Sequence, residues 1–332
     1  MATPAVVALA ERFPSASIHV ASGTWSREAW IGVRYIRGII DAGDFIGGRA
    51  PSLTSLSRLI KRIRRGNFDT ALVLERSMWP ALAVALAGVP TRAGLASGWR
   101  GIWHTRRYVV PPLIHEADLY LRAAGLLGAS PIPRPMEYVP SIEAIAAARA
   151  WLSSQALVGR PFAILHPGGG TNPGMALPSK RWPADRFAEI ATRLRQQGIV
   201  PIIVGGPSDR DAIDDVIAAS PGTIRTNAEA DLAFLAALAR ESQIYVGNDS
   251  GPTHLARAAR TPTVVVFGPS DERRYGPWGT VADGAAPGEA VAEPHLGPDA
   301  PAPPWLDRDV RAVTVDRVWS AVGRVLAQGA RA

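Results

Sequence analysis

The sequence contains no cysteine, and this absence excludes disulfide bonds and thiolate metal sites. A chain without cysteine fits a reducing compartment. No apolar stretch approaches the roughly 18 residues of a membrane-spanning helix, and residues 79–90 come nearest. The N-terminus has no basic region before its apolar residues, so it lacks the pattern of a secretory signal. With 332 residues, 47% of them hydrophobic and 20% charged, the chain is expected to be a globular protein of two domains.

Lysine is scarce as well. Only Lys61 and Lys180 occur, and every other basic residue is an arginine. In such a background a retained lysine indicates a position that needs a compact ammonium rather than a planar guanidinium. Lys180 follows a glycine-rich stretch, and we therefore expect it to contact a ligand.

Acidic residues are few in the first half of the chain. Residues 1–160 carry 19 Lys and Arg against 10 Asp and Glu, whereas residues 161–332 carry 17 against 19. A basic first half implies an anionic partner such as a phosphorylated glycolipid, an acidic membrane surface or nucleic acid. The alternative is a solvated basic face in an arginine-rich protein. No RNA-binding signature is present and the basic residues are not interleaved with an aromatic platform, so we expect no nucleic-acid partner.

Strands and helices are expected to alternate along the chain, which predicts parallel sheets and an α/β fold. We expect residues 1–130 to form a first domain, the proline-rich residues 131–141 a linker, and residues 142–332 a second domain. Residues 281–309 are rich in Ala, Pro and Gly and are expected to form an irregular surface loop. The expected strands are 17–20, 70–74, 91–95, 108–110, 162–166, 200–204, 244–246 and 263–267, and the expected helices are 4–12, 53–65, 79–87, 115–127, 142–154, 183–197, 209–218, 231–240 and 314–326.

Residues 244–268 have the pattern of a strand, a tight turn, a helix and a second strand. In the turn, Asp249 and Ser250 offer capping oxygens, and Pro252 suits the first turn of a helix because it has no N–H. This unit aims a helix N-terminus, with its free N–H groups, past the carboxyl end of a strand, where phosphates bind. His254 lies close to the same turn. The alternative is a well-capped helix with a satisfied histidine.

Two further loops should open on the same edge of the sheet. Residues 166–180 contain glycines that allow close backbone approach, the hydroxyl of Thr171 and the ammonium of Lys180, in neither a dinucleotide nor a P-loop spacing. In residues 205–209, Asp209 either accepts a hydrogen bond from a ribose hydroxyl or caps a helix. Hydroxyls, a lysine and a helix N-terminus together predict a pyrophosphate site that requires no metal. Neither a Gly-x-Ser-x-Gly motif nor a metal-spaced histidine pair occurs.

At these residues the sequence resembles the family 9 glycosyltransferases, which include the ADP-heptose:lipopolysaccharide heptosyltransferases. The resemblance rests on three motifs and continues through residues 266–278, more weakly in the first half, where residues 2–5 and 11–14 carry it. The motifs are His166-Pro-Gly-Gly-Gly, Ser179-Lys-Arg-Trp-Pro183 with the helix after it, and Asp249-Ser-Gly-Pro-Thr-His254.

The resemblance implies a GT-B architecture, in which two Rossmann-like domains face a cleft, the second holding the nucleotide sugar and the first the acceptor. It implies inverting transfer of a heptose from ADP-heptose to an anionic lipopolysaccharide-core acceptor, without a tightly bound cofactor. A cytoplasmic location, peripheral on the inner face of the membrane, goes with that activity. The residues that the family pattern assigns to the donor are Lys180, Asp249, Ser250, Gly251 and His254, and, with a variable loop, Thr171.

The start of the chain departs from the family pattern. The family begins with a strand and a Gly-Asp whose carboxylate is the expected general base, whereas residues 3–4 already begin a helix. We therefore expect the first strand and the base to lie upstream of Met1, and no catalytic residue is named in the first domain. Asp41 and Asp44 are the alternative carboxylates. An inactive nucleotide-sugar binding protein and a sugar-nucleotide epimerase of the same fold are the alternative functions.

Overall fold

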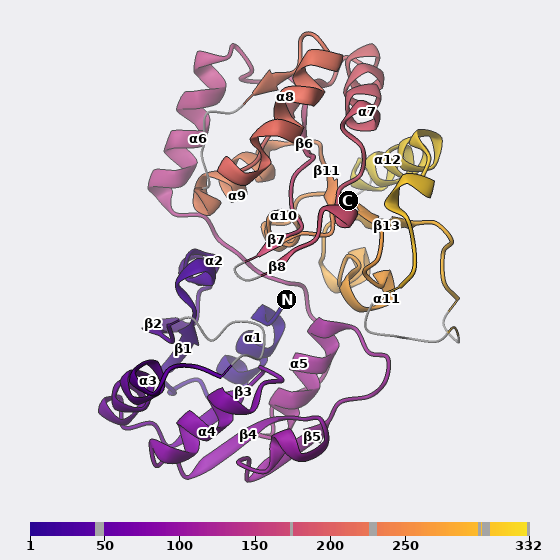
Figure 1. Cartoon of the computed structure of the whole chain (residues 1–332). Coiled ribbons are helices and arrows are strands. Elements are labelled where there is room, and N and C mark those ends of the chain that lie inside the picture. Colours follow the sequence, from indigo (N-terminus) through magenta and orange to yellow (C-terminus); the bar gives the residue numbers. More distant parts are fainter. Residues whose placement is uncertain (44–49, 173–174, 226–230, 298–299, 301–305, 331–332) are drawn as a thin grey trace. The chain divides into compact units, whose positions relative to one another are not determined.

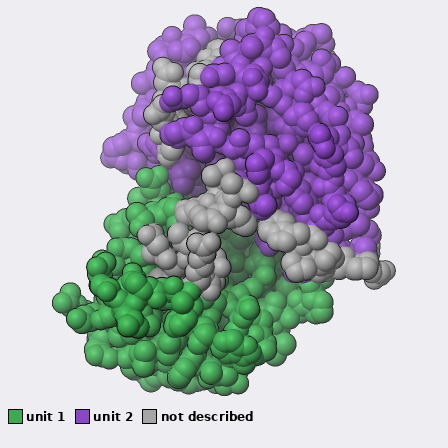
Figure 2. Space-filling model, in the orientation of Figure 1, with its two compact units in different colours: residues 1–133 green, residues 134–332 purple. Residues whose placement is uncertain are grey.

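The structure, a computed structural model, describes residues 1–43, 50–172, 175–225, 231–297, 300 and 306–330. The chain divides into two compact units, residues 1–133 and residues 134–332 (Figure 2). Each unit alternates strands with helices, and the strand pairs within its main sheets are parallel (Figure 1). The α/β fold that the sequence predicts is confirmed.

Unit 1 holds two small parallel sheets. One has the order β1-β2 and the other the order β3-β4-β5. Helix α1 packs against α5 through small side chains such as Ala5, Ala8 and Ala124. The elements are α1 (Thr3–Arg12), β1 (Ile18–Ser22), η1 (Thr24–Ser26), α2 (Glu28–Ile31), β2 (Ile36–Asp41), α3 (Leu53–Arg65), β3 (Thr70–Val73), α4 (Met78–Leu86), β4 (Thr91–Ala96), η2 (Gly98–Gly101), β5 (Arg106–Val109) and α5 (Glu116–Gly125).

Unit 2 is built on one parallel sheet of six strands with the order β10-β9-β6-β11-β12-β13. The elements up to β10 are α6 (Ile142–Ser154), β6 (Phe162–His166), β7 (Thr171–Asn172), β8 (Met175–Ala176), η3 (Pro178–Lys180), α7 (Ala184–Gln196), β9 (Val200–Ile203), η4 (Pro207–Asp209), α8 (Arg210–Ala219) and β10 (Ile224–Arg225). The later elements are α9 (Leu232–Glu241), β11 (Ile244–Asn248), α10 (Gly251–Ala258), β12 (Thr263–Phe267), α11 (Glu272–Tyr275), η5 (Val281–Asp283), β13 (Gly288–Ala292), η6 (Val310–Ala312) and α12 (Val315–Gly329).

The core of unit 2 lies on both faces of this sheet. Successive strand residues point to opposite faces, so Leu165 and Val246 join the cluster under α7, α8 and α12, while Ile164 and Tyr245 join the cluster under α6 and α9. Because both faces are covered, β6, β11 and β12 are buried along their whole length. This explains why the sequences of these strands are mainly apolar and do not alternate between apolar and polar residues.

Two expectations about secondary structure are wrong. Residues 281–309 do not form only an irregular loop, because β13 pairs with β12 at the edge of the sheet. Strand β2, which pairs with β1, was not expected at all. Strand β13 is bounded by prolines and rich in alanine, and the pairing of both strands depends on contacts with a neighbouring strand that local propensity does not encode.

The order of the strands locates a switch point. From β6 the chain passes outward through β9 to β10, and it then returns to place β11 on the other side of β6. The connections leave the carboxyl ends of β6 and β11 in opposite directions. Ligands of open parallel sheets bind at such a point.

Trp182 joins this edge to the core. Its side chain is 1% exposed, its Nε1 donates to the Val313 carbonyl at 2.8 Å, and its ring lies edge-on to Phe187 at 5.1 Å. Trp182→Ala removes this packing, so the unfolding free energy should fall by about 3–5 kcal/mol, measured by denaturant titration. Trp25→Ala, at an exposed tryptophan of unit 1, is the control and should cost less than about 0.5 kcal/mol. Equal unfolding midpoints for the two variants would contradict this account of the core.

Candidate functional site

The three loops singled out in the sequence leave neighbouring strands of unit 2. One follows β6, one follows β9, and one joins β11 to α10. The register pairs Gly247 of β11 with His166 of β6, so the first and third loops begin side by side at the switch point. The expectation that these loops open on one edge of the sheet is therefore confirmed.

Asn248 ties two of these loops together. Its Oδ1 accepts from the backbone N–H of Trp182 at 3.0 Å, and its Nδ2 donates to the carbonyls of Pro167 and Gly168, each at 2.9 Å. The side chain is fully buried, and its amide donors and acceptor are satisfied. Sequence reasoning assigned Asn248 no role. The sequence feature that could have indicated its role is an amide side chain at the last position of an otherwise apolar strand.

Asp249 is the centre of the site. Its Oδ2 lies 2.6 Å from Lys180 Nζ and its Oδ1 lies 3.1 Å from His254 Nε2. The residue is 5% exposed. Burial alone would raise the pKa of Asp249, but the hydrogen bonds and charges of His254 and Lys180 outweigh burial and hold the pKa well below its ordinary value. The carboxylate therefore stays ionised and fixes two nitrogen donors from separate loops.

The N-terminus of α10 lies directly after Asp249. Ser250 is the N-cap residue, yet its side chain makes no capping hydrogen bond, and Pro252 stands in the first turn. The expectation that Asp249 and Ser250 provide capping oxygens is wrong, because Asp249 binds Lys180 and His254, while Ser250 Oγ lies 3.3 Å from His166 Nδ1 and 3.1 Å from Thr253 Oγ1. A helix start without a side-chain cap leaves backbone N–H groups for an anion.

The glycine-rich loop lies close against the other two loops. Gly169 and Gly170 have φ values of +100° and +74°, which favour glycine. A Cβ on Gly169 would stand 2.8 Å from Ser250 Cβ, and one on Gly168 would collide with the Asp209 carboxylate. Only glycine permits this approach. The backbone of Thr171 belongs to β7, but its side chain lies outside the described part of the chain, so its contact with the donor stays a prediction.

Asp209 fastens the glycine-rich loop. Its Oδ1 accepts from Gly169 N at 3.1 Å and from Arg181 at 3.3 Å, and its Oδ2 accepts from Gly206 N at 3.0 Å, which closes the turn that begins η4. Burial opposes ionisation, but the nearby His166 and the N–H groups of Gly169 and Gly206 hold the pKa of Asp209 well below its ordinary value. Asp209 is the N-cap residue of α8, but its side chain makes no capping hydrogen bond to that helix, so the capping interpretation is confirmed only for the turn η4. The ribose contact stays a prediction at a carboxylate that already has three donors.

Arg181 is a second residue that sequence reasoning left unassigned. Its Nε donates to the Gly169 carbonyl at 2.8 Å, and its guanidinium also reaches the Ser208 carbonyl and Asp209. One arginine thus spans the loops after β6 and β9. Its place next to Lys180 in the Lys-Arg-Trp-Pro motif was the available signal.

Of the two alternative carboxylates of unit 1, Asp41 is not arranged as a base. Asp41 accepts from Gly43 N and from Arg62, each at 2.8 Å. The hydrogen bond from Gly43 and the Arg62 guanidinium hold the pKa of Asp41 below its ordinary value, although partial burial opposes them. A general base works best with a pKa near the operating pH, so this carboxylate is poorly suited. Asp44 lies outside the described residues.

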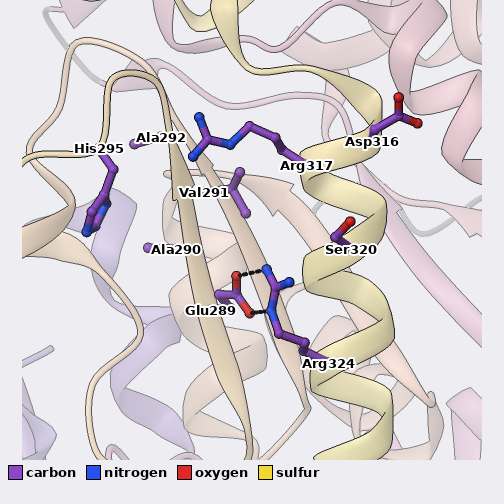
Figure 3. Close-up of a pocket in the computed structure, with 9 residues that line it drawn as sticks. All are labelled: Glu289, Ala290, Val291, Ala292, His295, Asp316, Arg317, Ser320 and Arg324. Atoms are coloured by element: carbon purple, nitrogen blue, oxygen red, sulfur yellow. Dashed lines mark hydrogen bonds and ion pairs between the residues drawn. The ribbon is translucent and has the colours of Figure 1, made fainter.

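A cavity of about 510 Å³ lies elsewhere in unit 2, between β13 and α12. Figure 3 shows its lining, in which Glu289 pairs with Arg324 across the groove. It contains none of the residues predicted for the donor. In the described part of the chain, no three His, Asp or Glu side chains gather into a metal-binding group. Among the same residues, no helix combines the length and the apolar character that crossing a membrane would require.

Comparisons with known proteins show which proteins the chain resembles. The chain is 28% identical over 289 residues to "Lipopolysaccharide heptosyltransferase 2" of Escherichia coli (strain K12), covering 79% of this chain and 77% of that protein. A solved structure of E. coli "ADP-heptose lps heptosyltransferase II" aligns with a TM-score of 0.75 and 22% identity, over 98% of this chain and 94% of that one. A "glycosyl transferase family 9" structure from Veillonella parvula aligns with a TM-score of 0.80 and 20% identity, over 98% and 92%.

These alignments show that the chain has the GT-B fold of the solved heptosyltransferases, as the sequence predicted. The family model described as "Glycosyltransferase family 9 (heptosyltransferase)" matches residues 56–293, which include all three loops of the site. Because that match spans most of the chain, the protein belongs to glycosyltransferase family 9.

Proposed function

We propose that this glycosyltransferase moves a heptose from ADP-heptose to an anionic lipopolysaccharide-core acceptor, with inversion at the anomeric carbon. The observation that carries the proposal is the cluster of Lys180, Asp249 and His254 at the N-terminus of α10. The names of the heptosyltransferases that align with the chain support the same donor and acceptor.

The cluster suits a diphosphate leaving group. Lys180 supplies a positive charge that Asp249 already holds in place, so little reorganisation is needed when negative charge develops on the departing ADP. Gly251 begins α10 and is exposed, and no described heavy atom lies within 4 Å of the place of a Cβ. A phosphate could therefore approach the backbone N–H groups of α10 without a metal ion.

Inversion requires a single displacement. The acceptor hydroxyl attacks the anomeric carbon from the face opposite the diphosphate, the bond to ADP breaks, and the hydroxyl proton passes to a base. We assign Lys180 and the start of α10 to the leaving group, Asp249, Ser250 and His254 to the donor diphosphate and sugar, and no residue to the base.

The charge of unit 1 fits an anionic acceptor at a membrane surface. Between Glu75 and Glu116 the chain has five arginines and no acidic residue. Of these, Arg92, Arg106 and Arg107 donate to backbone carbonyls rather than to carboxylates. Their charges therefore stay available to phosphates of a glycolipid or an anionic bilayer.

An exposed aromatic and aliphatic group accompanies these arginines. Trp99, Ile102 and Val109 are 63%, 50% and 75% exposed. Arg107 reaches the Ile102 carbonyl at 3.2 Å, and Val109, two residues along β5, points to the same face as Arg107. Tryptophan and arginine are the side chains that prefer the headgroup region of a bilayer. We propose that this surface of η2 and β5 contacts the inner face of the cytoplasmic membrane.

The donor is tested by calorimetry with ADP-, UDP- and GDP-sugars. ADP-heptose should bind best, and Lys180→Ala should weaken it by about 10- to 100-fold, because a charged hydrogen bond contributes about 1.5–3 kcal/mol. Lys180→Arg should recover only part of the affinity, since a planar fork does not replace a compact ammonium. Lys61→Ala, at the other lysine of the chain, is the control and should change nothing.

Tighter binding of a UDP- or GDP-sugar would refute the donor assignment, and equal affinity in Lys180→Ala would remove Lys180 from the site. NMR of the new anomeric linkage in the transfer product tests inversion: retention of configuration would overturn it.

Membrane contact is tested by sedimentation with vesicles of phosphatidylethanolamine and phosphatidylglycerol. Arg100→Glu with Arg107→Glu should reduce binding about tenfold or more, because each basic residue near an anionic surface contributes about 1 kcal/mol. Trp99→Ala should also weaken binding, whereas the controls Trp25→Ala and Arg160→Glu should not. If the wild type binds neutral phosphatidylcholine vesicles equally well, or none of the variants matters, the surface has been assigned wrongly.

A further inference from the structure

The buried His166 contacts Ser250 at the start of α10, and the function proposed above gives this histidine no role. His166 ends β6 and is 1% exposed. Its Nδ1 lies 3.3 Å from Ser250 Oγ, and its Nε2 lies 3.6 Å from Asp209 Oδ2, within ion-pair range but beyond a hydrogen bond. One imidazole thus lies between a hydroxyl at the start of α10 and an ionised carboxylate.

The protons of this chain of groups can be counted. Thr253 has one hydroxyl proton, and it donates that proton to the Asn248 carbonyl at 2.7 Å. In its 3.1 Å contact with Ser250, Thr253 can therefore only accept. Ser250 also has one hydroxyl proton, so its hydroxyl can donate a hydrogen bond either to Thr253 Oγ1 or to His166 Nδ1, but not to both. The protonation of His166 decides between the two.

A neutral His166 carries its proton on Nε2, because this nitrogen faces the Asp209 carboxylate. Its Nδ1 then accepts a hydrogen bond from the Ser250 hydroxyl. When Nδ1 is also protonated it donates to Ser250 Oγ, and the Ser250 proton turns away from the histidine. A phosphate oxygen has no proton to give, so Ser250 can bind it only by donating. Only the second arrangement leaves the Ser250 proton free for a phosphate.

We propose that His166 is a positioning residue that takes up one proton when the donor diphosphate binds, and that donor affinity therefore rises as the pH falls. The proposal rests on the proposed donor site. The proton enters on Nδ1, the Nδ1–H donates to Ser250 Oγ, and the Ser250 hydroxyl donates to a diphosphate oxygen. The Asp209 carboxylate, 3.6 Å from Nε2, favours a proton on this nitrogen and balances the imidazolium charge.

The surroundings of His166 support this assignment. Asp209, at the end of η4, is its acidic neighbour, and Arg181 after η3 reaches the other oxygen of that carboxylate. From β11, the ring of Tyr245 lies 6.3 Å away, and burial raises the pKa of Tyr245, so this phenol stays neutral. Ser250 and Thr253 come from the start of α10 and carry no charge. The other titratable side chain near the start of α10 is His254, and its Nε2 contacts Asp249 rather than His166 or Ser250.

The sign of the linkage follows from the proton count. If the bound state holds one more proton than the free state, affinity falls as pH rises wherever the free protein lacks that proton, by up to tenfold per pH unit. ADP-heptose is the appropriate probe because its diphosphate is a diester, whose own charge does not change between pH 6 and 9. Free ADP would titrate in that range and obscure the effect.

The experiment is calorimetric titration of ADP-heptose at several pH values and, at pH 7.5, in buffers of different ionisation enthalpy, which counts the protons taken up. Wild type should take up close to one proton and lose affinity as pH rises. His166→Gln keeps a neutral N–H donor, so it should bind with an affinity that does not change with pH and take up no proton. Ser250→Ala should abolish the uptake while the fold is retained, which keeps the test sound if His166→Gln does not fold.

His254→Gln is the matched control, because His254 is the other histidine of the cluster. It is expected to weaken binding and to leave the proton uptake in place. If the uptake instead disappears in His254→Gln and persists in His166→Gln, or if the wild type takes up no proton, the proposal is wrong. Failure of ADP-heptose to bind at any pH would refute the proposed donor instead, so the two failures are distinguishable.

Discussion

The site depends on one buried carboxylate. Asp249 stands at the end of the central strand β11 and contacts an ammonium from the loop after β6 and an imidazole from the next helix. Removing one partner of a buried charge pair costs about 3–5 kcal/mol, since the other charge is left without compensation. The contact therefore fixes Lys180 before any ligand arrives. Asn248 and Asp209 extend the same constraint to the surrounding loops.

Much of this arrangement could be predicted from the sequence. Residues 244–268 fold as β11, α10 and β12, as the local signals indicated, because two buried strands and a proline-started helix are encoded within 25 residues. The topology of a parallel sheet then brings the carboxyl ends of its strands to one edge. Lys180, Asp249 and His254 are found together for that reason.

What the sequence did not reveal are the contacts between residues far apart in the chain. Asp249 was expected to offer a cap, yet it pairs with Lys180, 69 positions away. Asp209 accepts from Gly169 of the glycine-rich loop, 40 positions earlier. Arg181 and Asn248 bridge loops in the same way. A side chain's partner depends on which loops the sheet brings together, and local propensity says nothing about that choice. The edge strand β13 escaped notice for the same reason.

The central claim is that the donor diphosphate binds at the start of α10, against the Lys180–Asp249–His254 cluster. A crystal structure of the protein with ADP-heptose tests it most directly. We predict diphosphate oxygens within hydrogen-bond distance of Lys180 Nζ and of a backbone N–H in the first turn of α10. A nucleotide bound elsewhere, such as in the cavity between β13 and α12, with the cluster making no contact to it, would contradict the account.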